Sequence, residues 1–166
     1  MESPAVLVKP REAAFAVGGP LVAGALLGLP FGIMALFDGA LRLPLVSFGV
    51  TLIMLPALQI ACAFGGFAVS PRQTVIAATE GLGRAGLVLL GLAPVVVFLL
   101  ASSDAVSTPV RVGTVAVGLS ALVGMRVMRR TLFGDEPTRN AKLLFGAWAA
   151  IGNGIASSLF FETFVR

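Results

Sequence analysis

Three polar side chains stand within long apolar runs of the sequence: Gln59, Ser120 and Asn153. A polar group deep in a membrane helix is costly unless a partner or a ligand uses it. Counted from the expected cytoplasmic ends of their spans at about 1.5 Å per residue, their depths agree to within about 3 Å. We therefore predict that they meet inside a helical bundle, either as interhelical hydrogen bonds or as a polar seat for a small substrate or ion.

The other reactive residue types give little support for catalysis or metal binding. The chain has no His, and its single Cys, Cys62, lies in an apolar run. Nucleophilic catalysis needs Ser or Cys beside a base, whereas zinc and haem sites need His or several Cys. The carboxylates lie near the expected interfaces or in the tails, and only Asp135 and Glu136 are adjacent. We expect a non-enzymatic protein with no catalytic residues, no cofactor and no metal.

The composition favours lipid as the solvent. Of the 166 residues, 57% are hydrophobic and 12% are charged, against about 45–50% and about 25% in soluble domains. A soluble chain of this length would expose much of this apolar surface to water. The net charge of +4 does not indicate nucleic acid, because the positive residues flank apolar runs and form no groove with aromatic platforms.

The apolar runs predict an all-α fold, a polytopic membrane bundle of about five transmembrane helices in a single domain, residues 1–166. Ser70 and Pro71 are typical of a helix start. They predict a short amphipathic helix at the membrane surface after the second span. A short loop holding Asp38 and Arg42 is expected between the first two spans. The expected spans are about 13–37, 44–69, 87–102, 110–128 and 143–161.

The glycines 81, 83 and 86 follow the expected amphipathic helix. Glycine lacks a side chain and weakens helices. We therefore expect these three residues to loosen the chain before the third span.

The positive residues predict the orientation of these spans. With five spans, nine of the twelve Lys and Arg residues fall on the side of the N-terminus, which should therefore be cytoplasmic. We expect a multi-pass protein of the cell inner (plasma) membrane. The segment 126–142 is the most basic, and it either retains the topology or binds anionic lipid headgroups. Its positive residues are Arg126, Arg129, Arg130, Arg139 and Lys142.

Small residues recur at four-residue spacing in three of the spans. This spacing places them on one helix face, where a neighbouring helix can approach closely. The expected packing faces are Gly24, Gly28 and Gly32 in the first span, Ala57, Ala61 and Gly65 in the second, and Gly146, Ala150, Gly154 and Ser158 in the fifth.

The layout resembles bacterial Yip1-domain-like proteins, a group of small five-span membrane proteins. The similar parts are Leu43-Pro44-Leu45, Ser70-Pro71-Arg72-Gln73-Thr74, Pro94 followed by Phe98, Gly124-Met125-Arg126, and Trp148. The resemblance implies a membrane scaffold or accessory role without catalysis. It supplies no catalytic residues, and the chain departs from the group by lacking a long polar N-terminal region.

Two functions follow as expectations. The first is a non-enzymatic inner-membrane scaffold or accessory subunit that packs laterally, in a homo-oligomer or with other membrane subunits. The alternative is a small permease or channel subunit whose pathway passes Gln59, Ser120 and Asn153.

Overall fold

The chain folds into helices alone wherever its structure is described. The computed structural model describes residues 10–28, 33–102 and 108–164, and every regular element within these ranges is an α-helix. This confirms the predicted all-α class. The helices are α1 (Pro10–Gly28), α2 (Ile33–Phe64), α3 (Pro71–Ala101), α4 (Thr108–Phe133) and α5 (Arg139–Phe164).

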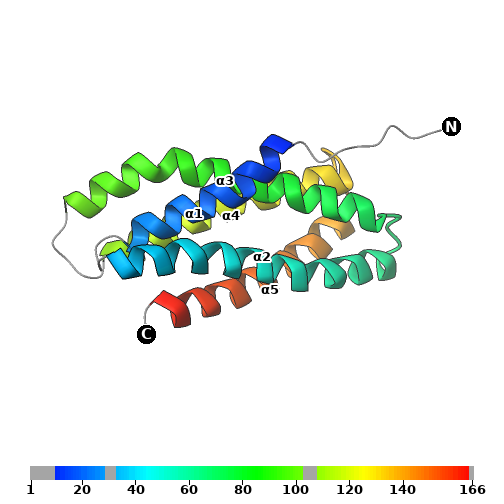
Figure 1. The fold of residues 1–166 in the computed structure, drawn as a ribbon. Coiled ribbons are helices and arrows are strands. Elements are labelled where there is room, and N and C mark those ends of the chain that lie inside the picture. Colours follow the sequence, from blue (N-terminus) through cyan, green and yellow to red (C-terminus); the bar gives the residue numbers. More distant parts are fainter. Residues whose placement is uncertain (1–9, 29–32, 103–107, 165–166) are drawn as a thin grey trace.

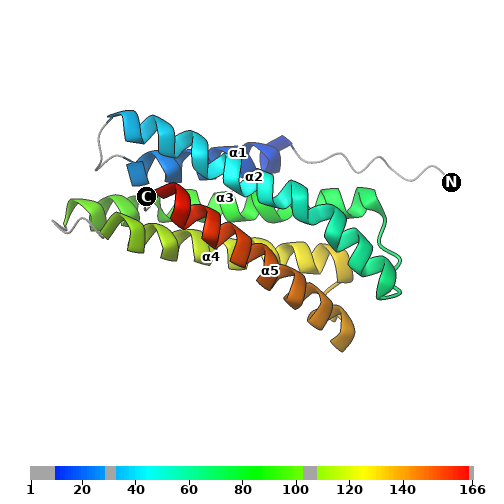
Figure 2. The same ribbon diagram turned by 90° about the horizontal axis from the view of Figure 1, so that it is seen from below.

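Successive helices run in opposite directions along one bundle (Figure 1). The end of α2, the start of α3, the end of α4 and the start of α5 therefore lie together at one end. We call it the basic end, because it carries Arg72, Arg130, Arg139 and Lys142. The opposite end is called the far end. Seen from below, α5 crosses the other helices obliquely (Figure 2), and it packs mainly on α2.

Three helical segments are long and apolar enough to cross a bilayer: Phe37–Phe64, Pro71–Ala101 and Arg111–Phe133. The shortest has 23 residues and is about 34 Å long at about 1.5 Å per residue, against about 30 Å of hydrocarbon in a bilayer. Large apolar side chains also face outward, such as Leu52 (72% exposed) and Phe98 (68% exposed). These features are those of a membrane protein.

The break between α1 and α2 differs from the prediction. The first expected span, 13–37, is divided, since α1 ends at Gly28 and α2 begins at Ile33. Asp38 and Arg42 lie within α2, where Arg42 Nε donates a hydrogen bond of 2.6 Å to Asp38 Oδ1 one turn away. The two charges satisfy each other on the helix surface. They therefore do not mark a loop.

The predicted amphipathic helix is continuous with the third span. Ser70 Oγ accepts a hydrogen bond of 3.2 Å from the backbone N–H of Gln73, and Pro71 is the first helical residue, so the predicted helix start is confirmed. The helix then continues to Ala101. The Gln73 side chain donates a hydrogen bond of 3.3 Å to the backbone oxygen of Thr131 in α4.

The glycines expected to loosen the chain are buried packing positions inside α3. A Cβ on Gly86 would collide with the backbone oxygen of Phe15 in α1. A Cβ on Gly81 would lie 2.9 Å from the backbone oxygen of Gly124 in α4. The expectation was wrong because the missing side chains allow α1 and α4 to approach the α3 backbone.

Two apolar clusters hold the bundle together. The basic-end cluster joins α2, α3, α4 and α5 and includes Leu58, Cys62, Met128 and Phe145. Its Cys62 is 1% exposed, as expected of a small core residue. The far-end cluster joins α1, α3 and α4 through Leu27, Leu89, Val96 and Ala116.

Candidate functional site

The structure brings two of the three predicted polar residues to one cavity. Ser120 of α4 and Asn153 of α5 both line a cavity of about 300 Å³ between α2, α3, α4 and α5. Gln59 of α2 is not among the residues that line it. The expectation that all three meet at one point is therefore wrong for Gln59.

Gln59 instead ties α2 to the start of α3. Its side-chain Nε2 donates a hydrogen bond of 2.7 Å to the backbone oxygen of Val69, and its Oε1 accepts one of 2.6 Å from the hydroxyl of Thr74. The equal-depth prediction fails because the helix ends differ from those expected. Gln59 lies five residues before the end of α2, whereas Ser120 lies thirteen residues before the end of α4. Both donor and acceptor groups of this amide are satisfied, as a structural tie requires.

The cavity is bounded by one face from each of four helices and by Pro20 of α1. On α2 this face runs from Leu43 to Met54, and on α5 it runs from Trp148 to Ser157. The faces of α3 and α4 supply mostly Gly, Ala, Leu, Val and Met. A cavity of 300 Å³ reaches the size of small-molecule pockets, about 300–1,000 Å³. The volume of this cavity makes it a binding-site candidate.

Away from the mouth-side residues Thr114 and Ser157, the hydroxyl groups that line the cavity donate to their own helices. Ser47 Oγ donates a hydrogen bond of 2.8 Å to the backbone oxygen of Leu43, and Thr51 Oγ1 donates one of 2.7 Å to the backbone oxygen of Ser47. Ser120 Oγ donates 2.8 Å to the backbone oxygen of Val117. A hydroxyl has one proton and two acceptor lone pairs. These oxygens therefore present acceptor capacity, and no free donor, to a molecule in the cavity.

Asn153 supplies the only side-chain amide among the described residues that line the cavity. Its Nδ2 donates 2.7 Å to the backbone oxygen of Ala149 and lies 3.1 Å from the sulfur of Met125. Its Oδ1 accepts no hydrogen bond from the part of the chain that the structure describes. One strong acceptor thus remains available at the inner wall of α5.

The cavity is closed toward the basic end and open at its side. Met128 and Trp148 line the cavity and also belong to the basic-end cluster or pack against it. The Trp148 indole donates a hydrogen bond of 2.8 Å to the backbone oxygen of Met54. Thr114 and Gly118 of α4 and Ser157 of α5 line the cavity and are exposed. We call these three residues the mouth. It lies on the α4–α5 side, two to three turns from Arg126 toward the far end.

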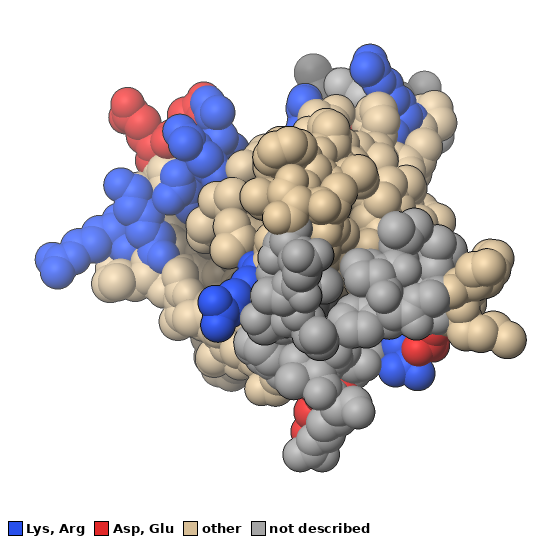
Figure 3. Space-filling model, turned by 90° about the vertical axis from the view of Figure 1, so that its left-hand side faces the viewer, with Lys and Arg blue, Asp and Glu red and all other residues tan. Residues whose placement is uncertain are grey.

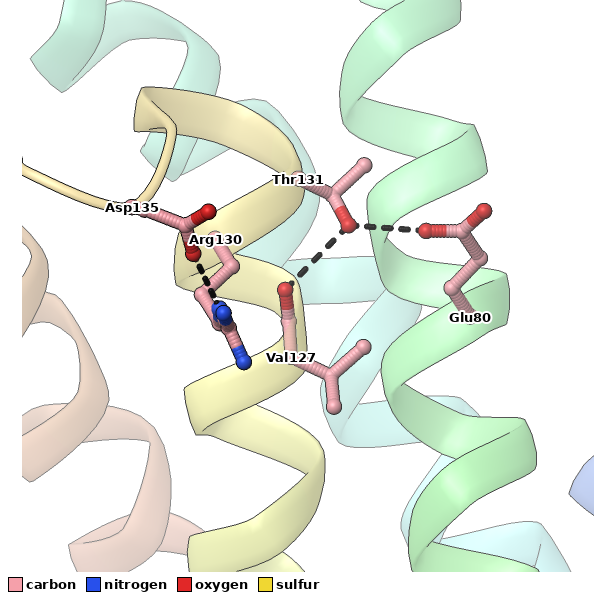
Figure 4. Close-up of polar contacts among 5 residues, drawn as sticks. All are labelled: Glu80, Val127, Arg130, Thr131 and Asp135. Atoms are coloured by element: carbon pink, nitrogen blue, oxygen red, sulfur yellow. Dashed lines mark hydrogen bonds and ion pairs between the residues drawn. The ribbon is translucent and has the colours of Figure 1, made fainter.

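The basic segment makes polar contacts that join α3 to α4 (Figure 4). Thr131 Oγ1 donates 2.7 Å to Glu80 Oε2, and Arg130 Nε lies 2.5 Å from Asp135 Oδ1. The remaining positive residues of the segment differ in exposure: Arg126, Arg139 and Lys142 are exposed, whereas Arg129 is half-buried and its Nε has no hydrogen-bond partner among the described residues.

Charged side chains project from the periphery of the bundle. In the view along the bundle, positive side chains gather beside acidic ones at the upper left, and uncharged residues lie between them and the positive side chains at the upper right (Figure 3).

The predicted packing faces have different surroundings. Gly24 lies where α1 meets α2, because a Cβ there would collide with the backbone oxygen of Gly39. Gly28 ends α1, and Gly32 lies outside the described residues. In the second face Ala57 is exposed, Ala61 is half-buried, and Gly65 is exposed beside the side chains of Phe67 and Leu144. All four residues of the α5 face, Gly146, Ala150, Gly154 and Ser158, are exposed.

Sequence reasoning missed four polar residues of the cavity: Ser47, Thr51, Thr114 and Ser157. For Ser47 and Thr51 the signal was the four-residue spacing of two hydroxyls on one face of the second span. Among the described residues, no group of three His, Cys, Asp or Glu side chains is placed to hold a metal ion. No protein-family model, curated protein or solved structure matches the chain.

Proposed function

We propose that this chain is a non-enzymatic, multi-span scaffold or accessory subunit of the inner membrane that packs laterally through the outer face of α5. The observation that carries the proposal is the unpartnered small-residue face of α5. A Cβ on Gly146 or Gly154 would have no neighbouring atom within 4 Å among the described residues. The glycines at 81, 86 and 124 are instead pressed against other helices of the same chain.

Larger apolar side chains flank this face. Leu143, Ile151 and Ile155 are exposed beside the small residues. Small residues four apart, flanked by large ones, form a shallow groove into which a second helix can pack closely. The same groove on a second copy is self-complementary, so a two-fold related pair of α5 helices is the simplest assembly. Other membrane subunits remain the alternative partner.

Five spans with a cytoplasmic basic end complete the proposal. α3 and the apolar segments of α2 and α4 have the necessary length and composition, and α5 adds 26 residues. The concentration of Arg and Lys at the basic end supports its retention in the cytoplasm. Arg126 and Arg139 are exposed there and are available to anionic lipid headgroups. The resemblance to Yip1-domain-like proteins would fit such a scaffold.

The experiment is a substitution that fills the α5 groove. Gly154→Leu should convert the purified protein in mild detergent from a dimer to a monomer, because the added side chain keeps the two helices apart. Light scattering coupled to size-exclusion chromatography measures the mass. Gly91→Leu is the matched control, since Gly91 on α3 is also exposed with no described neighbour within 4 Å. A monomeric wild-type protein would contradict self-association, and a Gly154→Leu protein that stays dimeric would contradict packing through the α5 groove.

A second candidate function, a small permease or channel subunit, is favoured by one observation. Ser120 and Asn153 border the same large cavity. The function would require the cavity to accept a small polar solute and pass it across the bilayer. Gln59 takes no part in such a seat, because its amide is engaged by Val69 and Thr74.

A further inference from the structure

The residues that line the cavity could bind a ligand whether or not α5 packs against another helix. We propose that the cavity binds an uncharged lipid alcohol that enters sideways from the bilayer through the mouth. The inference does not depend on lateral packing, because that contact uses the outer face of α5. The lining residues Ala149, Gly152 and Asn153 lie on the inner face.

The lining favours an uncharged molecule. No Lys, Arg, Asp, Glu or His side chain is among the described residues that line the cavity. A charged group placed there would lose its hydration without gaining a counter-charge, which is strongly unfavourable. Free fatty acids, phospholipid headgroups and inorganic ions therefore fit poorly.

Away from the mouth, the hydrogen-bonding groups of the cavity favour a ligand that donates a proton. The hydroxyls of Ser47, Thr51 and Ser120 already donate to carbonyls of their own helices. The Asn153 amide nitrogen is engaged as well, and its Oδ1 accepts no hydrogen bond from the described residues. A lipid hydroxyl complements these acceptors, whereas an ester or an ether offers no proton.

The position of the mouth favours a lipid over a water-soluble solute. Thr114, Gly118 and Ser157 are exposed on the flank of the bundle, and the basic-end cluster closes the cavity toward that end. Thr114 and Gly118 lie within the apolar segment Arg111–Phe133. A molecule reaching the mouth therefore comes from the hydrocarbon layer, with its chain along Leu43, Val46 and Val117 and its hydroxyl near Asn153.

Photolabelling of the full chain in lipid nanodiscs tests the proposal. The probe is a sixteen-carbon primary alcohol that carries a photoactivatable diazirine, and the labelled peptides are mapped by mass spectrometry. Labels should fall on the cavity faces of α2, α4 and α5. Unlabelled hexadecanol should compete at least about tenfold better than hexadecyl acetate, which lacks the hydrogen-bond donor, and better than hexadecanoate, which brings an unpaired charge.

Asn153→Leu should weaken competition by hexadecanol about tenfold. The matched control is Asn140→Leu, an exposed position on the same helix near the basic end, which should change nothing. Equal competition by the acetate, or labels confined to outward residues such as Leu52, would overturn the proposal. Competition by glycerol alone would replace the lipid alcohol with a polar solute, as the permease requires. Gly154→Leu should retain binding as a monomer, which separates this inference from lateral packing.

Discussion

Replacing Gly86 by Ala should lower the free energy of unfolding of the bundle by at least about 3 kcal/mol, the upper part of the range for overpacking. The added Cβ would collide with the backbone oxygen of Phe15. A backbone atom cannot move aside as a flexible side chain can, so α1 would have to separate from α3. Unfolding in SDS, followed by the fluorescence of the single Trp148, measures the loss.

Gly91→Ala is the control for this experiment. Gly91 lies on the same helix, and no described atom comes within 4 Å of the place that a methyl group would take there. Ala is the better helix former by about 1 kcal/mol, so this variant should be as stable as the wild type or slightly more stable. Equal stability of Gly86→Ala and Gly91→Ala would show that α1 does not pack on α3 in this way.

Leu58→Ala should cost about 3 kcal/mol of unfolding free energy, within the usual range of about 2–5 for buried Leu to Ala. Leu58 is 0% exposed in the basic-end cluster, so its removal leaves a cavity that neither lipid nor water can reach. The same SDS titration measures the change.

Leu52→Ala provides the comparison on the same helix. Leu52 is largely exposed, and in the bilayer a lipid chain takes the place of the deleted atoms. Its effect should stay within about 0.5 kcal/mol, as for other surface substitutions. A cost for Leu52 as large as that for Leu58 would mean that α2 is rotated or covered by another subunit on this side.

Composition and the length of the apolar runs predicted the helical class, because an apolar run in lipid must satisfy its backbone hydrogen bonds within itself. Helix boundaries were predicted less well. The charges of Asp38 and Arg42 suggested a loop, yet they form an ion pair within α2. A sequence cannot distinguish a paired charge on a helix from a solvated one in a loop.

The contacts of the glycines were also only partly predictable from the sequence. The spacing of Gly24 did indicate a close approach, and its partner is Gly39. Gly81, Gly83 and Gly86 follow one another at intervals of two and three residues, and this density suggested a loose segment. Which glycines meet another backbone depends on helix pairing, and pairing is a property of the fold and not of one helix.

The polar residues were predicted in type but only partly in position. Asn153 and Ser120 do share a cavity, whereas Gln59 is drawn to the α2–α3 connection by Val69 and Thr74. The reason is that α2 ends at Phe64 and the chain turns back beside it. The depth of a residue follows from where its helix ends, and about five residues of error amount to about 7 Å.

The proposed membrane topology depends on the orientation of α3. We infer that this helix crosses a bilayer with the basic end inside the cell. Single cysteines at Arg72, Ser102 and Lys142, introduced into a Cys62→Ala background, test it with a membrane-impermeant maleimide on intact cells. We expect Ser102→Cys to be labelled from outside, and Arg72→Cys and Lys142→Cys only after permeabilisation. Labelling of both ends of α3 from the same side, or of Lys142→Cys together with Ser102→Cys, would contradict this orientation.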